Sequence, residues 1–98
     1  MATYITTIKF TEKGIVGIKD TCKRASSFKA AAKKMGVKVS NIYWTLGRFD
    51  GVIVLDAKDE ETATAAMLHL SSKGNVQTST SRAYDAAEME KVLGMLPK

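Results

Sequence analysis

The chain has 98 residues, 45% of them hydrophobic and 26% charged, with a net charge of +5. This length allows one hydrophobic core and the composition is that of a globular protein, so a disordered chain and a chain of two domains are excluded. No membrane span is expected, because the chain has no run of about 18 apolar residues, and MATYITTIKF does not have the pattern of a signal peptide. The single cysteine, Cys22, leaves no intrachain disulfide and no cysteine-based metal site.

We therefore expect a single cytoplasmic domain over residues 1–98. Its first predicted element is a strand over residues 3–10. This segment, TYITTIKF, alternates and is rich in β-branched and aromatic residues. A helix is predicted from Ile15 to Met35 by the helical period of its apolar residues. Thr11 is expected to cap the start, which Gly14 and Gly17 make irregular. The arc that this helix buries comprises Ile18, Cys22, Ala25, Phe28, Ala32 and Met35.

The same helix carries much of the positive charge of the chain. Its basic residues fall opposite the apolar arc, as is typical of a solvated helix face; they are Lys19, Lys23, Arg24, Lys29, Lys33 and Lys34, with Asp20 as the single acidic residue. A nucleic-acid site would be better supported by aromatic residues between the basic ones or by a known motif. Nucleic acid is therefore not a favoured partner.

Two strands joined by a hairpin follow. The segment Val37–Leu46 alternates, with Val39, Asn41, Tyr43 and Thr45 on one side and Ser40, Ile42, Trp44 and Leu46 on the other. The segment Val52–Ala57 is apolar on both sides until Asp56, which predicts a strand covered on both faces. The glycines of the connection, Gly47 and Gly51, are expected to take positive φ angles.

The last part of the chain gives a helix, a strand and a second helix. Asp59 is expected to cap a helix from Glu60 to about Ser72. A strand rich in threonine and serine is predicted over residues 75–84. Asp85 and Glu88 then form a capping-box pattern, which predicts a terminal helix over residues 85–96.

This order of elements predicts an α+β, ferredoxin-like βαββαβ fold, with a core over residues 3–84 and a four-stranded antiparallel sheet. Right-handed crossovers put both long helices on one face of the sheet. The other face would then expose apolar residues, which a soluble monomer rarely does. We therefore expect self-association through this face, with the terminal helix as an alternative cover.

The hairpin sequence resembles that of the GYD domain family, which is named for a Gly-Tyr-Asp signature. The matching residues are Gly47, Phe49 and Asp50 in LGRFD, and Phe49 stands where the family commonly has tyrosine. Further matching pieces are TEKGI, IKD and KGNVQTST, so the resemblance extends over Ala2–Tyr84.

The resemblance implies a fold of the dimeric α/β-barrel group, in which two ferredoxin-like units pair their sheets face to face. GYD proteins have no generally assigned biochemical role. The larger group includes heme-degrading and quinone-forming monooxygenases, muconolactone isomerases and effector-binding domains of Lrp-type regulators. Those effector domains have a Gly-x-Tyr-Asp hairpin beside a small-ligand pocket at a subunit interface. A shared fold does not assign a reaction.

The candidate ligand-binding residues are Tyr4, Tyr43, Gly47, Phe49, Asp50 and His69, while catalytic residues are not identified. Asp50 either bonds backbone amides of the turn or faces a ligand, and the turn is the simpler interpretation. His69, the one histidine, suits the rim of a helix stripe, with heme ligation or general base catalysis as alternatives. The spacing of residues indicates no metal site, and no cofactor is evident.

We therefore expect a small oligomeric protein that binds or senses a small molecule, with a pocket at a subunit interface near Gly47–Asp50. One alternative is an enzyme of the monooxygenase or isomerase kind that uses the same cavity. Another is a structural assembly unit without a ligand. No phosphate loop, nucleophile elbow or paired-carboxylate motif supports the enzyme.

Overall fold

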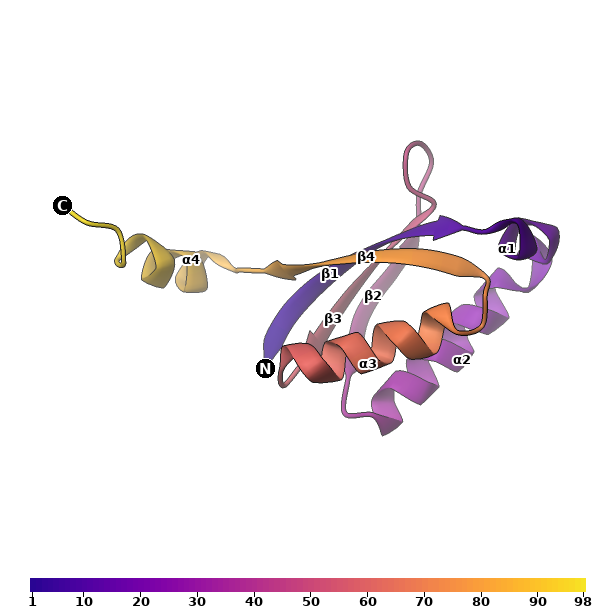
Figure 1. Ribbon diagram of the computed structural model, residues 1–98, viewed down its shortest axis with the longest axis horizontal. Helices are drawn as coiled ribbons and strands as arrows, with labels where there is room; N and C mark the ends of the chain where they lie inside the picture. The colour runs from indigo at the N-terminus through magenta and orange to yellow at the C-terminus, as the bar shows by residue number, and fades with distance from the viewer.

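The computed structural model describes all 98 residues and contains one four-stranded antiparallel sheet (Figure 1). The elements in chain order are β1 (Ala2–Phe10), α1 (Glu12–Val16), a 3₁₀ turn (Ile18–Asp20), α2 (Thr21–Lys34), β2 (Lys38–Trp44), β3 (Gly51–Ala57), α3 (Glu60–Ser71), β4 (Val76–Ala83) and α4 (Ala86–Leu93). The strands lie side by side in the order β2-β3-β1-β4. This is the ferredoxin-like topology that the sequence predicts.

The core lies between the sheet and the two long helices. Figure 1 shows α2 and α3 on the same side of the sheet. Tyr4, Ile53 and Leu55 face them from the two central strands and pack with Phe28 of α2 and Ala66 of α3. The alternation of buried and half-buried residues along β3 follows from the two faces of a pleated strand.

The opposite side of the sheet, which we call the open face, has no helix over it (Figure 1). Its centre is apolar, with Ile5 paired to Val54 and Tyr43 paired to Val52 in neighbouring strands. Its β4 side is polar: the residues there are Gln77, Ser79 and Ser81, and β1 adds Thr3 and Thr7. The predicted apolar open face is thus confirmed for its centre, whereas polar side chains cover one edge.

The long helix predicted from Ile15 to Met35 is wrong in its first third. Gly17 ends α1, a 3₁₀ turn follows, and α2 begins only at Thr21. Arg24 holds this break, because its guanidinium donates to the carbonyl oxygens of Gly14 (3.3 Å) and Gly17 (2.6 Å). The expected irregular start is therefore confirmed, and it is longer than the two glycines alone suggest.

Cys22 is exposed, so the prediction of a buried thiol is wrong. At about 100° per residue, Cys22 lies about 120° around α2 from Phe28, which is the centre of the buried face. The predicted arc included Cys22 because it continued the pattern through Ile18, which lies in the 3₁₀ turn and is 38% exposed.

A β-bulge in β2 corrects the predicted faces of that strand. The pairing with β3 shifts between Val39 and Asn41, so that Ser40 is an extra residue. Val39 therefore shares the helix side with Ile42 and is buried, instead of lying with Asn41 and Tyr43. The hydroxyl of the bulged Ser40 donates to Asp56 on the open face.

Only one of the two hairpin glycines has the expected conformation. Gly47 has φ of 118°, a backbone region that strains other residues. The prediction is wrong for Gly51, whose φ is not positive. Glycine suits this position for a steric reason, because a Cβ there would lie 3.0 Å from the carbonyl oxygen of Tyr43.

The terminal helix α4 points away from the sheet and does not cover it (Figure 1). The predicted capping box is confirmed, with Asp85 and Glu88 each bonding the backbone of the other, although the helix ends at Leu93. The extended position of α4 accounts for a radius of gyration of 14.9 Å, against about 13 Å for a compact chain of this length. No helix of the chain has the length and apolar character needed to cross a bilayer.

Candidate functional site

A cavity of about 640 Å³ lies on the helix side of the sheet. It is bounded by α2, by the end of α3 with the turn that follows, and by strands of the sheet. Its apolar lining includes Ile8, Phe10, Phe28, Ile42, Ile53 and Leu70. We call this space the helix-side cavity.

Some of the residues that face the cavity are small. Ala25 and Ser27 of α2 and Gly51 of β3 are among the lining residues, together with the larger Phe28 and Ile53. The two long helices also rest on different strands, α2 on β2 and α3 on β3 and β4. The cavity lies between these helices and the sheet.

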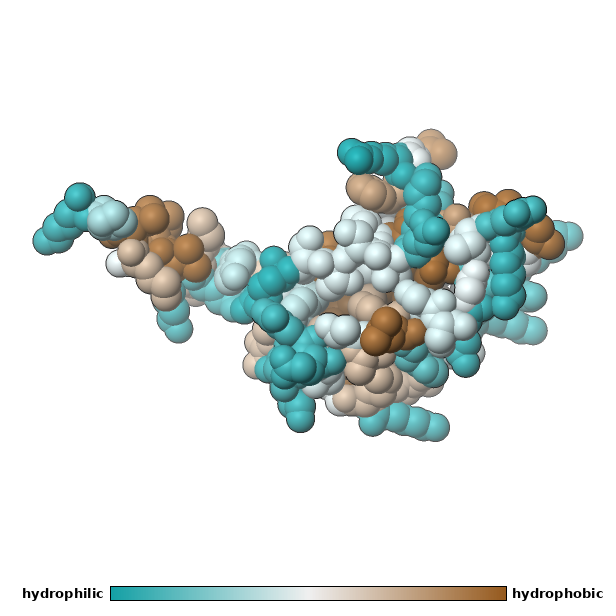
Figure 2. Space-filling model, viewed as in Figure 1, coloured by the Kyte–Doolittle hydropathy of each residue, from teal (hydrophilic) through white to brown (hydrophobic).

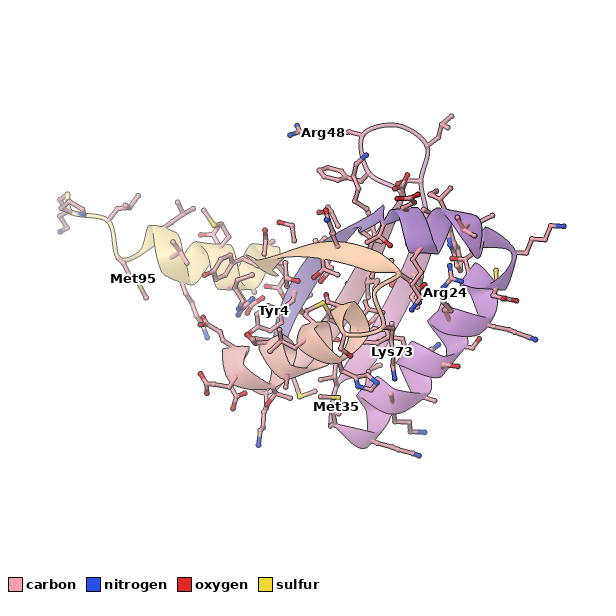
Figure 3. The ribbon with its side chains drawn as sticks, turned by 45° about the vertical axis from the view of Figure 1, so that its right-hand side comes forward. Tyr4, Arg24, Met35, Arg48, Lys73 and Met95 are labelled. Atoms are coloured by element: carbon pink, nitrogen blue, oxygen red, sulfur yellow. The ribbon has the colours of Figure 1, made fainter.

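The mouth of the cavity is predominantly basic. Four cationic side chains, Lys13, Lys23, Arg24 and Lys73, line it against two carboxylates, Asp20 and Asp50. Figure 3 shows Arg24 and Lys73 near each other, between α2 and the turn after α3. None of the four cations forms an ion pair, because the one salt bridge of the chain joins Arg82 to Glu88.

Contacts between α1 and the turn after α3 form one wall of this mouth. The Thr11 hydroxyl donates to the Gly74 carbonyl (2.6 Å), and the Thr11 amide donates to the Asn75 carbonyl (3.1 Å). The Lys13 ammonium donates to the Lys73 carbonyl (2.8 Å). Two segments about sixty residues apart in sequence are thereby fixed side by side, and their lysines lie at the same opening.

Asp50 lines the cavity and also holds the hairpin to the end of β1. Its amide donates to the Ile8 carbonyl (2.8 Å), and its carboxylate accepts from the Phe10 amide (2.8 Å). The sequence favours a bond from Asp50 to backbone amides of the turn, whereas the amide that its carboxylate accepts from belongs to β1. One carboxylate oxygen, Oδ2, is used in this way, so a role toward a ligand is left to Oδ1.

Asp50→Ala is expected to destabilise the fold by about 1–2 kcal/mol, because the half-buried Phe10 amide loses its acceptor. Asp50→Asn is the matched control, since its amide oxygen can still accept from Phe10. Chemical denaturation of the three proteins checks this. Equal stability of the wild type and Asp50→Ala would show that the bond to Phe10 contributes nothing.

The structure brings together some of the predicted site residues and separates others. Asp50 and the half-buried His69 line the helix-side cavity. Tyr43 borders it, although the Tyr43 hydroxyl accepts from Asn41 on the open face. Gly47 and Phe49 lie at the exposed hairpin tip, where the Arg48 guanidinium is 5.5 Å from the Phe49 ring centre.

Tyr4 does not line the helix-side cavity. It is 5% exposed and borders a second cavity of about 370 Å³ between α3 and β4. Sequence reasoning did not name Lys13, Lys23, Arg24 or Lys73 as site residues, and it assigned Lys23 and Arg24 to a solvated helix face. No group of three His, Cys, Asp or Glu side chains comes together in a way that could hold a metal ion.

The base of α4 is fixed by Arg82. Its guanidinium pairs with the Glu88 carboxylate (2.8 Å), lies 4.6 Å from the ring centre of Tyr84, and donates to the carbonyl of Ala83. The hydrogen bond from Arg82 lowers the pKa of Glu88, and the backbone amide of Asp85 adds to this. The same hydrogen bond with Glu88 raises the pKa of Arg82.

The attachment of α4 is expected to weaken in acid. Because the folded pKa of Glu88 lies below its unfolded value of about 4.3, the stabilisation is complete above that value and is lost as pH falls through the folded pKa. NMR signals of α4 should therefore shift toward disorder before those of the sheet. Glu88→Gln should remove this pH dependence, and an unchanged acid profile in that variant would contradict the assignment.

Sequence comparison assigns the family. The GYD domain profile matches residues 4–93, so the chain belongs to the GYD domain family, and the match extends into α4 beyond the segment predicted from the resemblance. A Thermus thermophilus protein named glutamine synthetase and cystathionine beta-lyase binding protein is 33% identical over 90 residues. That alignment covers 91% of this chain and 95% of the relative.

Structure comparison gives the same fold. The crystal structure of MtbAldR aligns with a TM-score of 0.61 at 14% identity, over 86% of this chain and 53% of the other. The crystal structure of a Thermus thermophilus protein aligns with a TM-score of 0.58 at 22% identity, over 88% and 96% of the two chains. At these identities the likeness shows the fold alone.

Proposed function

We propose that this GYD protein binds a small molecule and acts as a binding or sensor module. The observation that carries the proposal is the helix-side cavity of about 640 Å³. Its volume lies within the range of about 300–1,000 Å³ that is usual for small-molecule sites. An apolar lining with a few polar groups at the mouth is also the usual composition of such sites.

The cavity does not lie where the sequence interpretation put the pocket. That interpretation placed a ligand between the open faces of two subunits, near Gly47–Asp50. The helix-side cavity is on the opposite side of the sheet and needs one chain only. Self-association through the open face remains part of the proposal, with the apolar centre around Ile5 and Val54 as its support.

A thermal-shift screen against metabolites, heme and flavins tests the proposal. A ligand present at about one hundred times its Kd adds about 2.7 kcal/mol of stability, which raises the Tm of a domain of this size by about 10–20 °C. The response should disappear in Ala25→Trp, which fills the cavity, and persist in Ala30→Trp, an exposed position on the same helix. A response of equal size in both variants would place the ligand elsewhere.

A second candidate function is the binding of another protein. Its support is α4 with the residues that follow it, which project from the domain and expose apolar side chains (Figure 2). These are Met89 and Leu93 of α4, and Met95 and Leu96 after it. An isolated helix of this kind leaves its apolar face without a partner. The Thermus thermophilus relative, whose name states that it binds two enzymes, adds weight to this candidate.

Purified glutamine synthetase and cystathionine beta-lyase are the partners to test first. Sedimentation with each enzyme should reveal a complex with the wild type and none with Leu93→Glu, which charges the apolar side of α4. Val16→Glu is the control, because Val16 is an exposed apolar residue far from α4. Absence of a complex with either enzyme would remove both as partners.

A further inference from the structure

We propose that the helix-side cavity takes an organic anion: a molecule with an apolar body and one carboxylate, sulfonate or phosphate group at the mouth. The inference rests on the proposed function and names the chemical class of the ligand. It follows from the unequal distribution of polar groups, since the floor is apolar and the mouth is basic.

The cations at the mouth have no anionic partner within the protein. Lys13 and Arg24 bond carbonyl oxygens, which leaves their charge uncompensated. Lys23 and Lys73 are exposed at the mouth and form no ion pair. Four positive charges at one opening repel one another, and an anion placed among them would relieve this repulsion.

The two carboxylates at the mouth do not reverse this balance. Asp50 already accepts the Phe10 amide, and Asp20 lies at the start of α2 without bonding a backbone amide. Four cations against two anions leave a surplus of two positive charges at the opening. The net charge of +5 on the whole chain also favours the approach of an anion.

The floor selects the body of the ligand. Phe10, Phe28 and Ile42 offer aromatic and aliphatic surface, and Ile8, Ile53 and Leu70 extend it. Burial of apolar ligand surface there is favourable, whereas a polar body would lose its hydration without replacement. A compound such as a sugar phosphate therefore fits less well than an aromatic or aliphatic acid.

Two fluorescent probes with the same body separate charge from apolar binding. Anilinonaphthalene sulfonate is an anion, and phenylnaphthylamine has the same rings without the sulfonate. Binding of each is measured by fluorescence titration with the wild type, Ala25→Trp and Ala30→Trp. Two double variants test the charge at the mouth. One replaces two lysines of the mouth, Lys23→Gln with Lys73→Gln. The control removes the same charge away from the mouth, with Lys33→Gln and Lys34→Gln at the end of α2.

The proposal predicts that the anionic probe binds about tenfold more tightly than its neutral twin. Ala25→Trp should abolish this binding, and loss of Lys23 and Lys73 should weaken it about five- to tenfold, with little effect of the control pair. Circular dichroism checks that each variant is folded, and the comparison of the two probes on the wild type needs no variant.

Three results would overturn the inference. Equal affinity of both probes, abolished by Ala25→Trp, leaves the proposed function intact but removes the anion preference. Equal weakening by both lysine pairs would show a general charge effect instead of a site. No binding, or binding that Ala25→Trp does not change, would exclude the helix-side cavity and with it the main support of the proposed function.

Discussion

Gly14→Ala is expected to destabilise the fold by about 2–3 kcal/mol, although alanine is the better helix former. A Cβ at Gly14 would lie 2.0 Å from the carbonyl oxygen of Asn75, a backbone atom that cannot move without shifting the turn after α3. The higher helix propensity of alanine stabilises the fold by at most about 1 kcal/mol. The free-energy cost of the clash with Asn75 is larger than this gain. Moving the Asn75 carbonyl to relieve the clash would also disturb its hydrogen bond with the Thr11 amide.

The same substitution should alter the mouth of the helix-side cavity, because Lys13 and Lys73 are held together by the contact that Gly14 allows. Denaturation curves measure the loss of stability, and NMR shifts of the turn after α3 report its displacement. Gly94→Ala is the control: Gly94 has no such neighbour, and its variant should remain within about 0.5 kcal/mol of the wild type. A stabilised Gly14→Ala would mean that α1 and this turn are not in contact in solution.

The fold is readable from the sequence because local signals and topology agree. The caps at Thr11, Asp59 and Asp85 each bond the amide three residues later. The apolar run of β3 predicts a central strand, and β3 lies between β1 and β2. Each of these features depends on neighbouring residues alone, which is the range over which sequence patterns are informative.

The errors arise where the period of a pattern changes. One extra residue at Ser40 reverses the side of every residue before it in β2, so an unbroken alternation assigns Val39 to the wrong face. The 3₁₀ turn before Thr21 rotates α2 relative to the preceding residues, so an unbroken helical period misplaces Cys22. Neither change has a distinctive residue type, since serine and aspartate occur in many positions.

The candidate site depends on contacts that no local pattern contains. The mouth of the helix-side cavity combines Lys13, Arg24 and Lys73 from three separate segments. Each of them has the sequence environment of an ordinary surface residue. Their convergence follows from the break before α2, which Arg24 holds, and from the contact at Gly14, and both are tertiary features.

The open face and the helix-side cavity would serve different purposes under the proposed function. The cavity is formed by one chain, so binding of a small molecule does not require a partner subunit. Asp50 connects the two, because it lines the cavity and fixes the hairpin that follows β2, the strand whose Tyr43 lies on the open face.

Ile5→Lys is expected to abolish self-association while leaving the isolated fold intact. Ile5 is 40% exposed at the centre of the open face, so a lysine there can reach water in a single chain and should change stability by about 0.5 kcal/mol or less. Face-to-face pairing would bury one unpaired ammonium from each subunit at a cost of several kcal/mol. Association should weaken by at least about one hundredfold.

Sedimentation equilibrium measures the effect. The wild type should have at least twice the chain mass of 10.6 kDa, and Ile5→Lys should have the chain mass itself. Val16→Lys is the control, since Val16 is 83% exposed on α1 and away from the open face. A wild type of the chain mass would show that the apolar centre of the open face is tolerated in water. If Ile5→Lys kept the mass of an oligomer, subunits would have to associate through another surface, for which the exposed apolar side of α4 is the alternative.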